Sequence, residues 1–225
     1  MPYAELHTLS CYSFLRGASH PQELVERAAE LGYRAIAITD ECSLAGVVKA
    51  HIAARQAGIQ LIIGSELNLV EGLQLIALAP SRAAYSELSG LISLARRRSP
   101  KGEYRVALRD VIFHLKRCLI IWKPTGAAVD DTGSNPSTAE LGYGQQLARL
   151  CRGRVWLGVT HVLGNDEIAR YGRLHALAHT LNLPMVACGA VRMHVASRKP
   201  LQDVFTALYH NTSVAQLGRR RLANS

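Results

Sequence analysis

Acidic residues follow two short apolar runs between residues 35 and 66, where they could ligate a metal ion or transfer protons. Asp40 and Glu41 follow the first run, and Glu66 follows the second. Between the runs, apolar residues recur at helical spacing up to Gly58, where a glycine usually ends a helix. Two strands joined by a helix lie parallel, and the carboxyl ends of parallel strands form the functional edge of such folds. The pattern therefore directs the carboxylates of Asp40 and Glu66 towards one mouth of the fold.

The alternation of apolar runs and helical patterns continues along the chain. Expected strands cover residues 3–9, 35–39, 60–64, 73–79, 118–122, 155–159 and 183–188. Expected helices cover residues 21–32, 44–57, 82–98, 108–114, 140–151, 167–181 and 199–210. An alternation of this length favours an α/β fold closed into a parallel barrel.

Two details of this prediction concern single segments. Ser43 is the expected N-cap of the helix at 44–57, with Val48 and Ile52 among its inward-facing residues. Residues 124–138 combine several turn formers with few apolar anchors, so we expect this loop to be poorly ordered.

Composition limits the cellular setting and the class of partner. The 225 residues are 48% hydrophobic and carry a formal net charge of +9. This balance favours an acidic partner such as nucleic acid, although many basic domains bind none. The five cysteines form no CxxC pair, which suits a reducing, cytoplasmic setting with buried thiols. We find neither a signal peptide nor an apolar run long enough to span a bilayer, so no membrane partner is expected.

Four motifs, in this order and spacing, carry a family resemblance. They are ELHTLSCYSFLRGAS from residue 5, AIAITDECSLAGVVKAH from residue 35, AGIQLIIGSEL from residue 57, and LPMVACGAVRMHVASRKPLQDVFTAL from residue 183. Together they resemble the N-terminal PHP (polymerase and histidinol phosphatase) domain of bacterial C-family DNA polymerases, in their error-prone, translesion branch. The resemblance covers nearly the whole chain and implies a distorted, TIM-barrel-like (β/α)7 barrel.

The resemblance also implies a metal site, which in this sequence is degraded. Active family members hold up to three divalent metals, with HxHxH on the first strand. Here these positions are Glu5, His7 and Leu9. The family's second motif keeps its acid at Asp40, has Glu41 in place of histidine, and is followed by Glu66 in the third. A family histidine corresponds to Gln74, and the last ligand pair to Ala190 and Arg192. What remains as a residual ligand set is Glu5, His7, Asp40, Glu41 and Glu66, which leaves room for one divalent ion, Zn, Mn or Mg.

Other charged side chains have ordinary structural explanations beside a functional one. Arg192 cannot ligate a metal, but its guanidinium could pair with Asp40, Glu41 or Glu66. His161 and His194 stand near strand ends, where they favour polar lining over spare ligation. Arginines end the helix at 82–98 and occur again in the tail; they complement a helix C-terminus or, as the weaker alternative, contact nucleic acid. These are Arg96, Arg97, Arg98, Arg219, Arg220 and Arg221.

The resemblance implies a PHP domain at residues 1–210, followed at 211–225 by the start of a linker to a polymerase domain. The parent protein would be an error-prone DNA polymerase acting in translesion synthesis and SOS mutagenesis, and this fragment would be inactive, with a structural or docking role. Its partners would be the polymerase domain of the same chain, DNA, and mutasome or sliding-clamp proteins. Two alternatives stay open: a metal-dependent phosphoesterase or 3′–5′ proofreading exonuclease, and a basic nucleic-acid-binding module.

Overall fold

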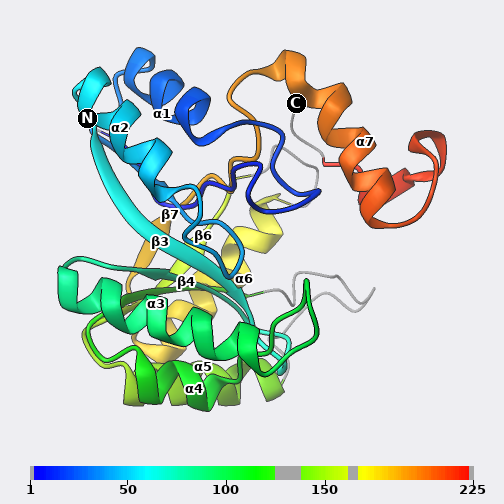
Figure 1. Cartoon of the computed structure of the whole chain (residues 1–225). Coiled ribbons are helices and arrows are strands. Elements are labelled where there is room, and N and C mark those ends of the chain that lie inside the picture. Colours follow the sequence, from blue (N-terminus) through cyan, green and yellow to red (C-terminus); the bar gives the residue numbers. More distant parts are fainter. Residues whose placement is uncertain (1–2, 125–137, 162–166, 223–225) are drawn as a thin grey trace. The chain divides into compact units, whose positions relative to one another are not determined.

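The computed structural model describes residues 3–124, 138–161 and 167–222 (Figure 1). It forms two compact units, one from residues 1–65 and 189–225 and the other from residues 66–188. Most of the loop expected to be poorly ordered, 124–138, lies outside the described residues. No helix among those described is both long and apolar enough to span a membrane.

One seven-stranded sheet contains the strands in chain order, from β1 to β7. They are β1 (Ala4–Glu5), β2 (Ala35–Ile38), β3 (Gln60–Asn68), β4 (Gln74–Leu78), β5 (Leu119–Lys123), β6 (Val155–Val159) and β7 (Met185–Ala187). Beyond β1 and β7, a parallel bridge joins Thr8 to Val191, with the Leu9 N–H donating to the Val191 carbonyl at 2.8 Å. The α/β barrel expected from the sequence is therefore confirmed.

The direction of β4 corrects the expectation that all strands run parallel. β4 pairs antiparallel with β5, whereas β5, β6 and β7 pair in parallel. A tight turn precedes β4, in which the Leu69 N–H donates to the Leu73 carbonyl at 2.8 Å and Gly72 takes a φ of +82°. Five residues cannot make the crossover that a parallel neighbour requires, so the chain reverses.

Helices α1 (Pro21–Glu30) and α2 (Val47–Ala57) pack together on the first unit (Figure 1). α2 begins later than predicted, at Val47, and its N-cap is Gly46 rather than Ser43. Its buried face is also different: Val48 and Ile52 are 68% and 52% exposed. The buried positions belong to small residues, which allow α1 and α2 to approach closely; they are Val47, Ala50, Ala53 and Ala54.

The remaining helices follow the predicted order closely. The second unit contains α3 (Arg82–Arg97), α4 (Leu108–His114), α5 (Thr138–Leu150) and α6 (Glu167–Leu181). The first unit continues after β7 with α7 (Lys199–Tyr209), and short 3-10 turns cover Ala196–Arg198, Val214–Gln216 and Gly218–Arg220. All five cysteines are free thiols, and only Cys11 among them is not buried, which agrees with the expected buried thiols.

Candidate functional site

Glu5 lies at the end of β1, and its carboxylate is bonded to the segment that follows β7. The residue is only 3% exposed. Oε1 accepts from the N–H groups of His7 and Gly189, both at 2.8 Å, and Oε2 accepts from Gly189 N–H and the Tyr3 hydroxyl, both at 3.0 Å. A Cβ at position 189 would lie 2.3 Å from Oε2, so only glycine allows this approach. The carboxylate therefore links the end of β1 to the segment that follows β7.

Asp40 follows β2 and is enclosed by the loop after β1. It is 1% exposed. Its Oδ1 accepts from the Ser10 N–H and the Ser13 hydroxyl, both at 2.7 Å, and its Oδ2 accepts from the Ser10 hydroxyl at 2.7 Å. The Ser13 hydroxyl in turn accepts from the Glu41 N–H at 2.9 Å. Both oxygens of Asp40 are thus used to fix the conformation of the 10–13 loop.

Burial dominates the electrostatics of these two acids. Desolvation raises the pKa of Glu5, and the hydrogen bonds from Gly189, His7 and Tyr3 oppose that rise only in part. Desolvation likewise raises the pKa of Asp40 against the hydrogen bonds from Ser10 and Ser13. The hydrogen bonds therefore stabilise each ionised carboxylate only in part, and burial still disfavours its charged form.

The other predicted ligands of the first unit have different surroundings. Glu41 forms an ion pair with Arg16, with 2.5 Å between Nη1 and Oε2. His7 is 2% exposed, and its carbonyl accepts from the Val191 N–H at 3.0 Å. Leu9, at the family's third histidine position, is a core residue that is 1% exposed.

Glu66 belongs to the second unit and lies within β3, which extends to Asn68, beyond the predicted end of that strand. Glu66 is fully buried, and its Oε1 accepts from Asn68 Nδ2 at 3.0 Å. Gln74 opens the reversed strand β4, and its Nε2 lies 3.4 Å from Asn68 Oδ1. The structure thus brings Glu66 and Gln74 together through Asn68, a residue that the sequence reasoning missed. Convergence of Glu66 with Asp40 stays a prediction.

The cation and histidines assigned to the site lining are placed as follows. Arg192 accepts a hydrogen bond at its carbonyl from Ala18 N–H at 2.7 Å; its pairing with a site carboxylate stays a prediction. His194 Nδ1 lies 2.7 Å from the Ser19 hydroxyl, on the first unit. His161 is at the surface of the second unit, where its Nδ1 lies 2.6 Å from Glu167 Oε1.

Two features of these side chains bear on metal binding: how closely they are grouped, and which of their lone pairs already accept hydrogen bonds. Among the described residues, no three His, Cys, Asp or Glu side chains are grouped so that they could hold one ion. Glu5 and Asp40 each accept several hydrogen bonds from N–H and O–H groups, which occupy the lone pairs that a metal would need. Within the described residues, the hydrogen-bonded carboxylates of Glu5 and Asp40 therefore offer few free lone pairs to an ion.

Several arginines marked as weak nucleic-acid contacts have local partners. Arg96 lies over the Tyr104 ring at 5.2 Å and donates to the Gly102 carbonyl at 3.2 Å. Arg98 pairs with Asp110, and Arg221 lies 3.4 Å from Asp203. Arg97 and Arg220 are exposed, and the side chain of Arg219 lies outside the described residues.

The family model described as the PHP domain matches residues 5–123, more than half of the chain. The chain belongs to the PHP domain family. This PHP domain is 53% identical over 224 residues to the error-prone DNA polymerase of Teredinibacter turnerae, and 48% identical over 225 residues to that of Saccharophagus degradans. Each match covers 100% of this chain and 21% of the polymerase, so the chain spans about a fifth of the length of these curated relatives. The resemblance read from the four motifs is confirmed.

Solved structures support the fold of the PHP domain. A protein of Bifidobacterium adolescentis described as a metal-dependent phosphoesterase superposes with a TM-score of 0.59 at 18% identity, covering 85% of this chain and 88% of that one. An amidohydrolase of Chromobacterium violaceum, solved with bound sulfate and no metal, gives a TM-score of 0.60 at 14% identity, covering 84% and 87%. At these identities the likeness concerns the fold alone.

Proposed function

We propose that this chain is the N-terminal PHP module of an error-prone DNA polymerase that acts in translesion synthesis and damage-induced mutagenesis in the cytoplasm, and that its role is structural and docking rather than hydrolytic. The sequence identity of 53% to one such polymerase over 224 residues supports the proposal that the parent protein is an error-prone DNA polymerase. The observation that carries the structural role is the use of Glu5 and Asp40 as hydrogen-bond acceptors for the protein's own chain.

The chemistry of phosphoester hydrolysis explains why this observation matters. Two-metal sites hold ions about 3.5–4 Å apart through shared acidic ligands. Glu5 and Asp40 are the acids best placed in the first unit, and both close loops instead. Leu9 adds an apolar side chain where the family has a ligand, so the remaining set is too small for such a centre.

Helix α7 supports the docking part of the proposal. Its polar side chains are turned inward: Gln202 is fully buried, and Asp203 and Thr206 are each 8% exposed. Two of its apolar side chains are turned outward, with Val204 43% and Leu208 60% exposed, whereas Ala207 is buried. An unpaired apolar helix face is costly in water and usually marks an interface. Because the polymerase relatives are about five times longer than this chain, we assign this face to the polymerase region of the same protein.

A hydrolysis assay tests the structural role directly. The purified chain should not cleave p-nitrophenyl phosphate or single-stranded DNA in the presence of Mn²⁺ or Zn²⁺, and chelation should leave its melting temperature unchanged. Metal-dependent turnover that Asp40→Asn abolishes would instead establish the phosphoesterase or exonuclease alternative. A melting temperature that falls on chelation would show that one structural ion is held.

A further inference from the structure

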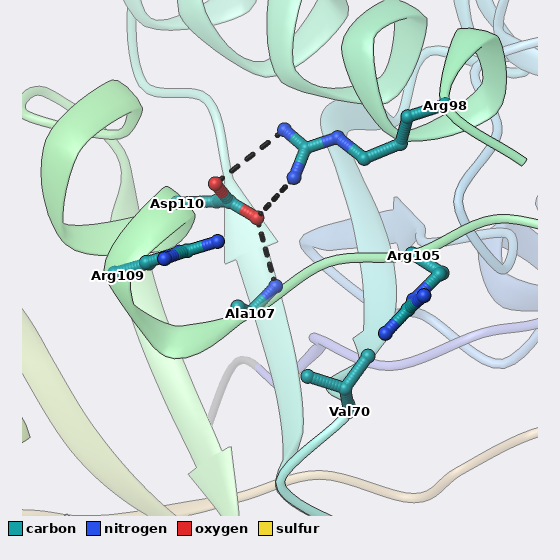
Figure 2. Close-up of a pocket in the computed structure, with 6 residues that line it drawn as sticks. All are labelled: Val70, Arg98, Arg105, Ala107, Arg109 and Asp110. Atoms are coloured by element: carbon teal, nitrogen blue, oxygen red, sulfur yellow. Dashed lines mark hydrogen bonds and ion pairs between the residues drawn. The ribbon is translucent and has the colours of Figure 1, made fainter.

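The second unit contains a hollow of about 270 Å³, and half of its lining residues are arginines (Figure 2). Its lining residues come from the turn between β3 and β4, the end of α3, the connection to α4 and the first turn of α4; they are Val70, Arg98, Arg105, Ala107, Arg109 and Asp110. Pockets for drug-sized ligands usually span about 300–1,000 Å³. The hollow therefore suits a small polar group better than a large apolar molecule.

Arg98 is held in a fixed position at this hollow. Its Nη1 lies 2.9 Å from Asp110 Oδ2 and its Nη2 lies 3.4 Å from Oδ1. Asp110 Oδ2 also accepts from the Ala107 N–H at 2.9 Å. Burial tends to raise the pKa of Asp110, but the hydrogen bonds from Ala107 and Arg98 and the charges of Arg98 and Arg109 outweigh it and leave the pKa lowered, so the carboxylate stays charged. A guanidinium has five N–H donors, and Asp110 uses only two of those on Arg98.

Arg105 and Arg109 bring two further guanidiniums to the same hollow. Figure 2 shows them on opposite sides of Ala107, with Arg109 extending from α4 and Arg105 from the connection before it. Both residues are exposed, and within the described part of the chain neither guanidinium has a hydrogen bond or ion pair, although the charge of Arg109 helps to lower the pKa of Asp110. Their donors are therefore available to a ligand.

The charges around the hollow favour an anion. Three arginines and one aspartate line it, which leaves two positive charges in excess. The nearby Glu71 does not line the hollow, and both its oxygens accept from the Leu108 N–H, at 3.0 and 3.1 Å. Planar guanidinium forks match the oxygens of phosphate in geometry and charge. We propose that Arg98, Arg105 and Arg109 form a binding site for a phosphate group.

Such a phosphate group could belong to the backbone of a single-stranded nucleic acid or to a free phosphate, and binding assays on the purified chain distinguish these sources. Anisotropy of a fluorescein-labelled oligothymidine should report binding that Arg105→Ala/Arg109→Ala weakens by about tenfold. The slope of log affinity against log salt should fall by about 1.4, because two contacts to a single strand are lost. A parallel calorimetric titration uses inorganic phosphate alone.

The matched control is Arg149→Ala/Arg152→Ala, which removes the same charge from exposed arginines of the same unit outside the hollow. It should change affinity by less than about twofold, since a surface charge away from the contact acts weakly. If Arg105→Ala/Arg109→Ala, here the hollow variant, loses oligothymidine binding and the control does not, the ligand is a backbone phosphate. Loss of phosphate binding alone identifies a free phosphate. Equal losses in both double variants, or unchanged binding of both ligands in the hollow variant, would overturn the site.

Discussion

Ser10 donates both its main-chain N–H and its hydroxyl to the carboxylate of Asp40, each at 2.7 Å. This double contact joins the loop after β1 to the end of β2 across thirty positions of sequence. Asp40, which the family resemblance predicts as a residual metal ligand, here holds a loop of its own chain through these hydrogen bonds. The Glu5 carboxylate likewise joins distant segments, because both its oxygens accept from the N–H of Gly189.

Removing the Asp40 carboxylate should therefore destabilise the fold strongly. Asp40→Ala leaves three donors from Ser10 and Ser13 without their acceptor in a site that is 1% exposed. We expect a loss of about 2–4 kcal/mol in the free energy of unfolding, measured by urea titration, and about 1–2 kcal/mol for Asp40→Asn, which keeps one acceptor oxygen. The exposed Glu26→Ala should change stability by less than about 0.5 kcal/mol. Equal stability of Asp40→Ala and wild type would show that Asp40 does not hold this loop.

Periodicity predicts the type and order of the helices and strands, but not how they pack against one another. The strands and helices were predicted because their apolar patterns are local. The reversal of β4 was missed, although the short connection through Gly72 contained the signal. The buried face of α2 was also wrong, because close packing on α1 selects Ala50 and Ala53 over the larger Val48 and Ile52.

The candidate site was only partly predictable for a different reason. The positions of the acids follow from strand ends, which are local features. Their partners Ser10 and Gly189 are far away in sequence, 30 residues from Asp40 and 184 from Glu5. The spacing of these residues does not predict that Ser10 and Gly189 donate hydrogen bonds to the two carboxylates.

The buried Glu5 should make stability depend on pH in a defined direction. Because burial raises its pKa in the folded state above the ordinary value of 4.5, the folded protein binds this proton more tightly than the unfolded chain. Its contribution therefore favours folding at low pH and is lost as pH rises through and above that value. Asp40 shifts in the same direction, so both acids act together in the wild type.

Glu5→Gln isolates this contribution. The amide oxygen can still accept from the His7 and Gly189 N–H groups, and the amide nitrogen can donate to the Tyr3 hydroxyl. The variant should gain stability relative to wild type as pH rises from acidic to neutral, measured by urea unfolding across that range. Parallel stability curves for the two proteins would show that Glu5 does not carry the dependence.

Cysteine labelling should distinguish the one partly exposed thiol, Cys11, from the four buried thiols. Burial raises the pKa of Cys118 to about 12, and burial also raises that of Cys151. Cys42 and Cys188 are buried, whereas Cys11 is partly exposed beside His20. Burial and the charge of Asp40 raise the pKa of Cys11, so its labelling should be slow.

N-ethylmaleimide near neutral pH, followed by mass spectrometry, should therefore place a single label on Cys11 in the folded chain and label all five cysteines in denaturant. Cys11→Ser serves as the control and should abolish labelling of the folded protein. Rapid modification of Cys118 before unfolding would show that the core around β5 opens more readily than its burial implies.

The outward apolar face of α7 should be dispensable in this chain and required in the full-length polymerase. Val204→Glu/Leu208→Glu places two charges on positions that are 43% and 60% exposed, so the isolated chain should keep its stability within about 0.5 kcal/mol. In the polymerase, burying each of these side chains is worth about 1.5–3 kcal/mol, and the charges would remove that contribution. Limited proteolysis should then separate this domain from the polymerase region at least about tenfold faster than in wild type.

The matched control for α7 is Val48→Glu/Ile52→Glu on α2, which changes another exposed apolar pair with the same spacing. This control should leave the proteolysis rate of the polymerase unchanged, because α2 already packs its alanine face against α1 and its outer face has no assigned partner. If the α2 variant rather than the α7 variant accelerates cleavage, the polymerase region packs on α2. If neither variant accelerates cleavage, the outward apolar face of α7 does not pack on the polymerase region, and the docking assignment is wrong.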